Sequence, residues 1–497
     1  MASEETIVAI STPPGRGGIG VVRLSGERAI EIVCSLIALA KVPPETQRAT
    51  VGEFRHPASG RALDQVVVTV FRAPHSYTGE DLVEISCHGA PVILAYLVEC
   101  CLERGARAAE SGEFTLRAFL SGRLDLTQAE AVRDLIESRT LYQARLAAEQ
   151  MEGAIATRLK PHKQALLEVI ARLEAGIDFA EDDVPVAGWE ETVANFDAIR
   201  ADLEQLAAGY EYGRVVREGL SLAVVGRPNV GKSSLFNRLL NEERAIVTAM
   251  PGTTRDLVAE TAAIGGIPLR LVDTAGVRES ADEAEQLGVR KTFQAIADSD
   301  LRLLVLDTSE DWTAEDSTLL ERLRPLGALL VACNKADLPQ RLAQSELDER
   351  LSGNFLEGAA WPPAGGMPGI EARPVPTTSS QLQPPSFEFR ASSFESVRTS
   401  ALTGEGIAEL KTRILELAAP TRDLDGGTLI TNLRHQQLLR ECVAALGKAG
   451  EAARQHIHHE MLLLDLYDAL HALDSITGAT TVEDMLSVIF SSFCVGK

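Results

Sequence analysis

The sequence lacks the features that mark secreted, membrane and disulfide-stabilised proteins. Its seven cysteines among 497 residues are scattered and odd in number and form no C-x-x-C pair, which argues against a disulfide framework and a cysteine zinc site. No apolar run approaches the ~20 residues that cross a bilayer. The acidic start, Met-Ala-Ser-Glu-Glu, is unlike a signal peptide. We therefore expect a cytoplasmic protein with reduced thiols and no membrane association.

Positive charge is also scarce. Lys and Arg number 48 against 71 Asp and Glu, which gives a net charge of −23. This balance argues against a broad surface that coats nucleic acid, although it permits a local basic patch. The most cationic stretch has a helical pattern, and we interpret its arginines as a solvated helix face: Arg117, Arg123, Arg133, Arg139 and Arg145.

Hydrophobic periodicity divides the chain into four segments. Residues 1–118 predict an α/β domain, with helices over Ala29–Ala40 and Pro91–Arg104. Helical patterns occupy residues 119–216 and 419–497, and Thr127 with Glu130 predicts a capping box near the start of the first. Because these segments flank a second α/β region at 217–418, we predict a multidomain α/β plus α protein with a discontinuous helical domain.

Two features of the α/β regions need interpretation. Gly15, Gly17 and Gly20 formally satisfy G-x-G-x-x-G, but two prolines precede them and a β-branched run follows. These neighbours predict a strand–turn–strand element and not a dinucleotide site. Seven prolines fall between Trp361 and Ser386, so we expect a disordered loop over 352–392, inside the second α/β region.

Residues 226–233, Gly-Arg-Pro-Asn-Val-Gly-Lys-Ser, form a G-x-x-x-x-G-K-S phosphate loop. An apolar strand precedes this loop and a helical pattern follows it, which is the context that the motif requires. The glycines allow backbone N–H groups to surround a polyphosphate at a helix N-terminus. We expect Lys232 to reach the β- and γ-phosphates and the Ser233 hydroxyl to bind Mg²⁺.

Three further motifs follow at predicted strand ends. Thr253 and Thr254 lie in a loop that can sense the γ-phosphate, and Asp273-Thr274-Ala275-Gly276 can bind the Mg²⁺ shell and the γ-phosphate. Asp337 of Asn-Lys-Ala-Asp can accept two N–H bonds from guanine, which adenine would leave unpaired. The order of the motifs predicts a Ras-like P-loop GTPase. The residues that we assign to GTP are Asn229, Val230, Gly231, Lys232, Ser233, Ser234, Thr248, Ala249, Met250, Pro251, Gly252, Thr253, Thr254, Asp273, Thr274, Ala275, Gly276, Asn334, Lys335, Asp337, Ser400, Ala401 and Leu402.

The whole chain resembles the bacterial tRNA-modification GTPases of the MnmE (TrmE) family. The resemblance is most specific in residues 6–26, in the GTPase motifs with Asn229, and in the last residues, Phe493-Cys494-Val495-Gly496-Lys497. It implies an N-terminal folate-binding and dimerisation domain, a helical domain in two segments, and an inserted GTPase domain. It also implies a homodimer that works with the flavoprotein MnmG, as a heterotetramer, on tRNA.

The resemblance implies a reaction and further site residues. The reaction adds an aminomethyl-type group, carboxymethylaminomethyl, at C5 of wobble uridine, with 5-formyl- or methylene-tetrahydrofolate as the one-carbon donor. The folate contacts are Arg23, Glu84, Arg123 (where some members carry lysine) and Lys497. Cys494 is a candidate thiolate for uridine chemistry, with a small apolar packing role as its alternative.

Val277 stands where Ras-like GTPases carry a water-orienting glutamine, so another group must orient water. By the resemblance that group is Glu285, and a K⁺ ion supplies the positive charge in the transition state as two GTPase domains dimerise. The side-chain carbonyl oxygen of Asn229 and the backbone carbonyl oxygens from Thr248 to Thr253 could gather beside the phosphates, and oxygen ligands suit a monovalent cation such as K⁺. We assign Mg²⁺ to Ser233 and Thr254, and K⁺ to Asn229, Thr248, Met250 and Thr253.

Two alternative functions stay open at this point. One is a GTPase switch in ribosome assembly or RNA binding that performs no modification chemistry. The other is a folate-dependent one-carbon enzyme in which the GTPase domain is ancillary. The N-terminal segment and the Cys-Val-Gly-Lys tail disfavour the first, as do the acidic balance and the lack of a recognisable RNA-binding module.

Overall fold

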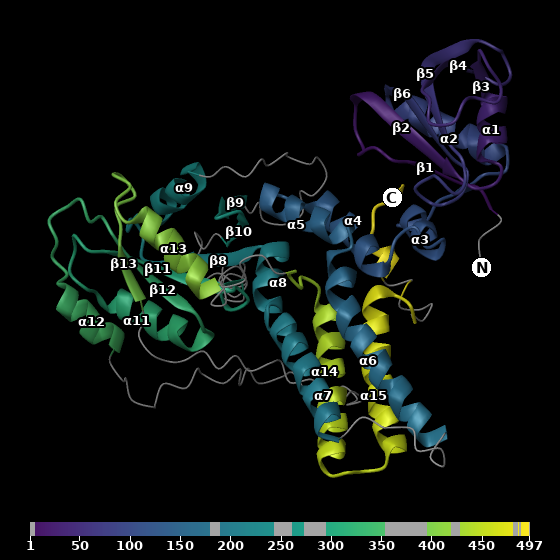
Figure 1. Cartoon of the computed structure of the whole chain (residues 1–497). Coiled ribbons are helices and arrows are strands. Elements are labelled where there is room, and N and C mark those ends of the chain that lie inside the picture. Colours follow the sequence, from purple (N-terminus) through teal and green to yellow (C-terminus); the bar gives the residue numbers. More distant parts are fainter. Residues whose placement is uncertain are drawn as a thin grey trace, which may run out of the picture. The chain divides into compact units, whose positions relative to one another are not determined.

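The computed structural model describes residues 5–178, 189–242, 261–272, 295–352, 395–418, 428–480, 486 and 489–496. These residues fall into two compact units (Figure 1). One contains the described residues before Gly219 and after Thr421, and the other contains those between Gly219 and Pro420. In the described part of the chain, no helix is both long enough and apolar enough to span a membrane.

The first unit begins with a sheet in the order β3-β4-β5-β6-β2-β1-β7. Strands β1 and β2 are antiparallel, with Ile7 opposite Ser25 and Ile10 opposite Val22, so the predicted strand–turn–strand element is confirmed. Helices α1 and α2 pack on one face of the sheet, over the buried side chains of alternating strand residues. The elements are β1 Ile7–Ile10, β2 Gly17–Ser25, α1 Ala29–Leu36, β3 Ile37–Leu39, β4 Thr50–Arg55, β5 Ala62–Phe71, β6 Leu82–Gly89, α2 Pro91–Glu103, β7 Arg107–Ala108 and α3 Glu113–Leu120.

The helix predicted over Ala29–Ala40 is wrong at its end. Helix α1 stops at Leu36, and residues 37–39 form β3, which pairs with the unpredicted strand β4. A Cβ built on Gly52 of β4 would lie 2.7 Å from side-chain carbons of both Ile37 and Leu39. The glycine therefore leaves room for two apolar side chains, and this tertiary pairing overrides the local helical pattern.

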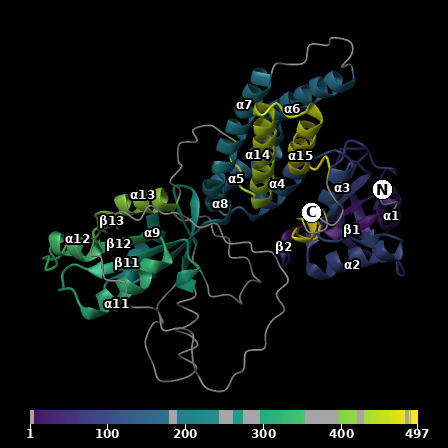
Figure 2. The same cartoon turned by 90° about the horizontal axis from the view of Figure 1, so that it is seen from below.

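The helical part of the first unit is built from two distant stretches of sequence. Helices α6 and α7 lie beside α14 and α15 in both views, as their different colours show (Figures 1 and 2). The four helices share one buried core. The predicted discontinuous helical domain is thus confirmed. The helices are α4 Leu126–Glu137, α5 Leu141–Met151, α6 Ala154–Asp178, α7 Trp189–Ala208, α8 Tyr210–Glu218, α14 Leu433–Arg454 and α15 His459–Thr477.

Two sequence interpretations of the α3–α4 region are wrong. Helix α4 is capped by Asp125, which forms the capping box with Gln128, whereas Thr127 and Glu130 are buried inside the helix. Thr127 Oγ1 donates to Asp125 Oδ1 at 2.6 Å, so it serves the cap without being the N-cap. Arg117 is only 6% exposed and forms ion pairs with Glu80 and Glu113, so it does not belong to a solvated face.

Glu130 joins the two stretches of the helical part. Its carboxylate accepts hydrogen bonds from Arg434 Nε at 3.0 Å and Arg434 Nη2 at 2.9 Å, and it lies 2.7 Å from His435 Nε2. Arg434 also donates to the carbonyl oxygens of Ser475 and Ile476 near the end of α15. Burial would raise the pKa of Glu130, but His435 and Arg434 outweigh it and lower the pKa to about 2.

We expect Glu130→Gln to lower the free energy of unfolding by about 3–5 kcal/mol, because Arg434 would keep a buried charge without its partner. Urea denaturation followed by circular dichroism measures this. Because the folded pKa lies below the ordinary 4.5, the wild-type contribution should be lost as the pH falls from about 4.5 towards 2. Glu137→Gln, at an exposed position on the same helix, is the control. Equal stabilities of the two variants would contradict the prediction.

The second unit is an α/β sheet in the order β13-β12-β11-β8-β10-β9, parallel except for the antiparallel pair β9–β10. Every residue of β11 and β12 is buried, as expected for central parallel strands covered by helices. The predicted P-loop α/β architecture is confirmed. The elements are β8 Leu220–Val225, α9 Lys232–Glu242, β9 Thr261–Ile264, β10 Ile267–Val272, β11 Leu301–Asp307, α11 Ala314–Leu323, η1 Arg324–Leu326, β12 Leu329–Asn334, α12 Gln344–Ser352, β13 Glu395–Arg398 and α13 Ile407–Ala418.

We expected a disordered loop over 352–392, and its first residue, Ser352, is instead the last residue of α12. Residues 353–392 of that prediction lie outside the described residues.

Candidate functional site

The phosphate loop joins β8 to α9. Asn229 has φ of +65° and Gly231 has φ of +97°, so the loop uses the left-handed backbone region twice. A Cβ on Gly231 would lie 2.3 Å from Asn334 Nδ2, which explains why this position needs glycine. These turns lead into the N-terminus of α9, where the free backbone N–H groups and the helix dipole favour an anion.

Lys232 and Ser233 occupy the first turn of α9. The Lys232 ammonium donates to the carbonyl oxygens of Gly226 and Arg227, both at 2.7 Å, and so lies across the loop. Ser233 is exposed beside it, so its hydroxyl is accessible to a metal–phosphate group. The arrangement fits a phosphate-bound Mg²⁺, although the other predicted Mg²⁺ ligand, Thr254, lies outside the described residues.

Arg227 of the phosphate loop is engaged by two carboxylates. It is therefore not positioned as an arginine finger, the catalytic arginine that stabilises transition-state charge in some GTPases. Its Nε donates to Asp316 Oδ1 at 2.8 Å, and its Nη1 lies 3.4 Å from Glu310 Oε2. Asp316 is buried and also serves the capping box of α11. The guanidinium therefore has carboxylate partners within its own unit.

Asn334 connects the phosphate loop to the loop that follows β13. It is 1% exposed at the end of β12. Its Nδ2 donates to the Val230 carbonyl oxygen at 2.9 Å, and its Oδ1 accepts from the Ala401 backbone N–H at 3.1 Å. One buried amide thus places the phosphate-binding and predicted base-binding segments next to each other. The sequence motif indicated that Asn334 belongs to the site but not that it has this bridging role.

The predicted base-reading residues also lie together. Ser400 Oγ donates to Asp337 Oδ1 at 2.5 Å and accepts from the Thr403 N–H, which fixes one carboxylate oxygen of an exposed Asp337. Lys335 Nζ pairs with Asp307 Oδ2 at 2.5 Å. Burial would raise the pKa of Asp307, but hydrogen bonds from Lys335 and Ser309 outweigh it and lower the pKa.

Several predicted site residues lie outside the described residues. The structure therefore does not place the water-orienting Glu285, the folate contact Lys497 or the residues of two predicted GTP-binding loops. The residues of these two loops are Thr248, Ala249, Met250, Pro251, Gly252, Thr253, Thr254, Asp273, Thr274, Ala275 and Gly276.

In the first unit, Arg23 and Glu84 face each other on neighbouring strands β2 and β6. Arg23 Nη2 donates to Glu84 Oε1 at 2.7 Å, and Arg23 Nε donates to the same oxygen at 3.1 Å. The Arg23 guanidinium lies 5.7 Å from the ring centres of Tyr77 and Phe114. A cation and a carboxylate on neighbouring strands thus lie beside the partly exposed ring of Tyr77 and the buried ring of Phe114 in α3. This set fits a ligand with a carboxylate and an aromatic hydrogen-bonding edge.

Arg123 and the C-terminal tail approach the same sheet. Tyr77 contacts Arg23, and two residues later a Cβ on Gly79 would lie 3.5 Å from Arg123 Cγ. The tail is held by Ser11 Oγ, which donates to the Gly496 carbonyl oxygen at 3.1 Å, and by a bridge between Ser111 and Val495. Ser11 follows Ile10, the register partner of Val22 next to Arg23, so Gly496 lies near the Arg23 strand.

Cys494 lies on this docked tail and is exposed. The alternative in which it packs as a small apolar residue under a terminal helix is therefore wrong. The remaining cysteines are buried or partly buried, and burial raises the pKa of Cys442 and Cys333 to about 12. Cys494 is thus the most exposed of the cysteine thiols, and Cys34 is partly exposed.

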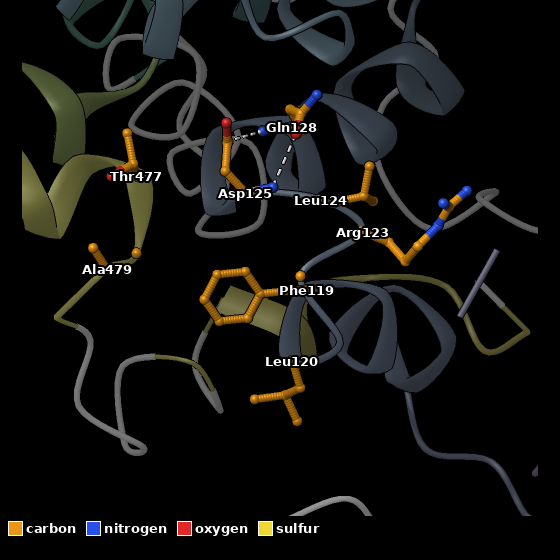
Figure 3. Close-up of a pocket in the computed structure, with 10 residues that line it drawn as sticks. Phe119, Leu120, Arg123, Leu124, Asp125, Gln128, Thr477 and Ala479 are labelled. Carbon is orange, nitrogen blue, oxygen red and sulfur yellow. Dashed lines mark hydrogen bonds between the residues drawn. The ribbon is translucent and has the colours of Figure 1, made fainter. Parts of the chain in front are cut away.

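A cavity of about 600 Å³ lies beside Arg123, between the α3–α4 turn and the residues that follow α15 (Figure 3). Phe119 supplies an aromatic wall, and the Arg123 side chain extends away from that ring. Asp125 and Gln128 bind each other's backbone N–H groups, both at 2.9 Å, as the dashed lines show. Their polar groups serve the cap of α4, so we assign no ligand to this cavity.

The mostly parallel sheet, the phosphate loop and the predicted base-reading residues that Asn334 holds next to that loop define a P-loop GTPase. The MnmE helical domain family matches residues 126–494, and the family described as GTP-binding protein TrmE N-terminus matches residues 6–123. The chain belongs to the MnmE family of tRNA modification GTPases.

Relatives cover the whole chain. The tRNA modification GTPase MnmE of Koribacter versatilis is 49% identical over 100% of both chains. That of Moorella thermoacetica is 40% identical over 99% of this chain and 100% of its own. Among solved structures, the G domain of the T. maritima FeoB iron transporter is 24% identical with a TM-score of 0.25, covering 40% of this chain and 98% of that one.

Proposed function

We propose that this chain hydrolyses GTP and uses the resulting domain rearrangement to support modification of wobble uridine in tRNA. The observation that carries the proposal is its full-length similarity to tRNA modification GTPases. We further propose that it acts in the cytoplasm as a homodimer with the flavoprotein MnmG, and that the product carries carboxymethylaminomethyl at C5. The domains that we assign are 1–118 for folate binding and dimerisation, 119–216 and 419–497 for the helical part, and 217–418 for the GTPase.

The nucleotide roles follow the geometry of the second unit. Lys232 and the loop N–H groups would hold the phosphates, Ser233 would bind Mg²⁺, and Asp337 with the Ser400 loop would read guanine. When bound, Mg²⁺ would supply positive charge that neutralises the phosphates. Thr254 as second Mg²⁺ ligand and Glu285 as water-orienting residue are proposed from the sequence resemblance.

The folate site is supported by the Arg23–Glu84 pair and its aromatic neighbours. Arg23 and Arg123 would bind carboxylates of a tetrahydrofolate derivative, and Glu84 would accept from its pterin edge. Lys497 would complete the site by resemblance. A bound formyl- or methylene-folate would supply the one-carbon unit. Cys494 is the candidate nucleophile, since its thiol is exposed on the tail docked near Arg23.

Mass spectrometry of wobble uridines from a strain that lacks this gene tests the proposal. We expect the C5-substituted uridine to disappear and to return when the full chain is supplied. Normal uridines together with defective ribosomal particles would replace the proposal with the ribosome-assembly switch. Full modification by the Lys232→Ala variant would favour the folate enzyme with an ancillary GTPase.

We also expect GTP turnover to be at least about tenfold faster in KCl than in NaCl at equal ionic strength, because a fixed positive charge at the transition state is worth ~10³–10⁵ in this chemistry. Asn229 is proposed as a K⁺ ligand with Thr248, Met250 and Thr253, and Arg227 is engaged by Asp316. Asn229→Ala should remove the difference between the salts. Equal wild-type rates in the two salts would refute the cation mechanism.

A further inference from the structure

Helix α5 contacts both chain segments that join the helical part to the GTPase segment. The outgoing segment is α8, after which β8 begins at Leu220. The returning segment is described from Thr428 and leads into α14, whose N-cap is Asn432. The backbones of the two segments touch, because a Cβ built on Gly213 of α8 would lie 2.0 Å from the Ile430 carbonyl oxygen.

Gln143 of α5 uses both ends of its amide group, and the Nε2 end binds the outgoing segment. Its Nε2 donates to the carbonyl oxygens of Val216 at 2.9 Å and Arg217 at 2.8 Å. These are carbonyls of the last turn of α8, which have no partner within their own helix. Its Oε1 accepts from the backbone N–H groups of Arg139 and Thr140 at the start of α5. Gln143 therefore ties the beginning of α5 to the end of α8.

Gln150 of α5 binds the returning segment. Its Nε2 donates to the Leu429 carbonyl oxygen at 3.1 Å and to Thr431 Oγ1 at 3.3 Å. Gln143 and Gln150 are only 8% and 4% exposed, so these hydrogen bonds are shielded from water. The two positions are two helical turns apart, about 10 Å, on one face of α5.

A further ion pair supports the outgoing segment from the neighbouring helix. Arg217 Nη2 donates to Asp134 Oδ1 of α4 at 2.7 Å. Helices α4 and α5 also pack against each other. The outgoing segment is thus held by both helices, while the returning one is held by the far end of α5. Because a helix is stiff over two turns, displacement of one segment would be carried to the other.

We propose that Gln143 and Gln150 are positioning residues that clamp the outgoing and returning segments into one neck, through which the nucleotide state of the GTPase reaches the helical part. Each binds main-chain or hydroxyl groups, so each fixes the path of the chain. This inference rests on the proposed function. It adds to that function the element that couples GTP hydrolysis to modification.

The test uses the full chain with two clamp variants. Gln143→Glu keeps the acceptor for the α5 cap but removes the donor to Val216 and Arg217. Gln150→Met removes the donor to the returning segment without adding charge. Gln164→Glu and Gln164→Met are the matched controls, because the Gln164 amide of α6 donates to Glu168 at the surface. Hydrogen exchange of residues 210–218 and 428–432 is measured with GDP and with a non-hydrolysable GTP analogue.

In the wild type and the controls, exchange of both segments should change together when the analogue replaces GDP. In each clamp variant, the released segment should exchange about tenfold faster, as expected for loss of a buried hydrogen-bond partner, and the joint nucleotide response should disappear. GTP turnover should stay within about twofold of wild type. Modified uridine formed per GTP hydrolysed should fall about tenfold.

Three results would overturn the proposal: nucleotide-insensitive exchange at these segments in the wild type, wild-type modification per GTP in both variants, or an equal loss of turnover and modification. The last would mean that the glutamines only maintain the fold. If the wild-type chain restores no modified uridine, the proposed function fails. The clamp is then judged by the exchange measurement alone, so the two failures are distinguishable.

Discussion

Replacing Lys232 by alanine is expected to reduce GTP turnover by at least about 10³-fold. The ammonium lies across the phosphate loop, 2.7 Å from the carbonyl oxygens of Gly226 and Arg227, at the N-terminus of α9. It is the side chain that we propose to bind the phosphates, whereas Arg227 is engaged by Asp316 and Glu310. Phosphate release under saturating GTP measures the effect.

The control for Lys232→Ala is the binding of the proposed folate ligand, which we assign to the other unit. Calorimetry with a formyl-folate should show binding by Lys232→Ala and none by Arg23→Ala, whereas Arg23→Ala should retain GTP turnover. The reason is that Arg23 and Lys232 belong to separate compact units. A folded Lys232→Ala protein that no longer bound the folate would contradict the assignment of separate sites.

The sequence predicted the architecture because its signals are local. The glycines and lysine of the phosphate loop, and the apolar run before it, specify a strand, a turn and a helix without distant information. The end of α1 could not be predicted in the same way. Residues 37–39 continue a helical pattern, and they become β3 because Gly52 of β4 leaves space for Ile37 and Leu39.

In the candidate site, too, local signals predicted some features and tertiary contacts determined others. Motif spacing predicted Lys232, Asn334 and Asp337 as site residues, since each lies at or after the end of a recognisable strand. The bridge from Asn334 to Val230 and Ala401 depends on the parallel packing of β8, β11 and β12, which no local pattern records. The neck contacts of Gln143 and Gln150 reach across as many as 281 positions of sequence. A glutamine on a predicted helix gives no signal of such a partner.

Replacing Asp337 by asparagine is expected to weaken GTP binding by about 10²–10³-fold, because a carboxylate that accepts two N–H bonds from guanine would lose a charge-assisted acceptor. One carboxylate oxygen, Oδ1, accepts from Ser400 Oγ at 2.5 Å. The carbonyl oxygen of asparagine can occupy the same place, so the Ser400 loop would keep its anchor. The amide NH₂ would then replace Oδ2 and present a donor to the guanine N–H groups.

The same change should improve binding of xanthosine triphosphate, because xanthine carries an oxygen where guanine carries its exocyclic amino group and so can accept from the new NH₂. Competition of each nucleotide against a fluorescent GDP analogue measures both affinities. Asp311→Asn, at an exposed position of the same unit, is the control and should alter neither. Because Lys232, Ser233 and the phosphate loop are unchanged, turnover at saturating xanthosine triphosphate should approach the wild-type rate with GTP. Unaltered GTP affinity in Asp337→Asn would show that another group reads the base.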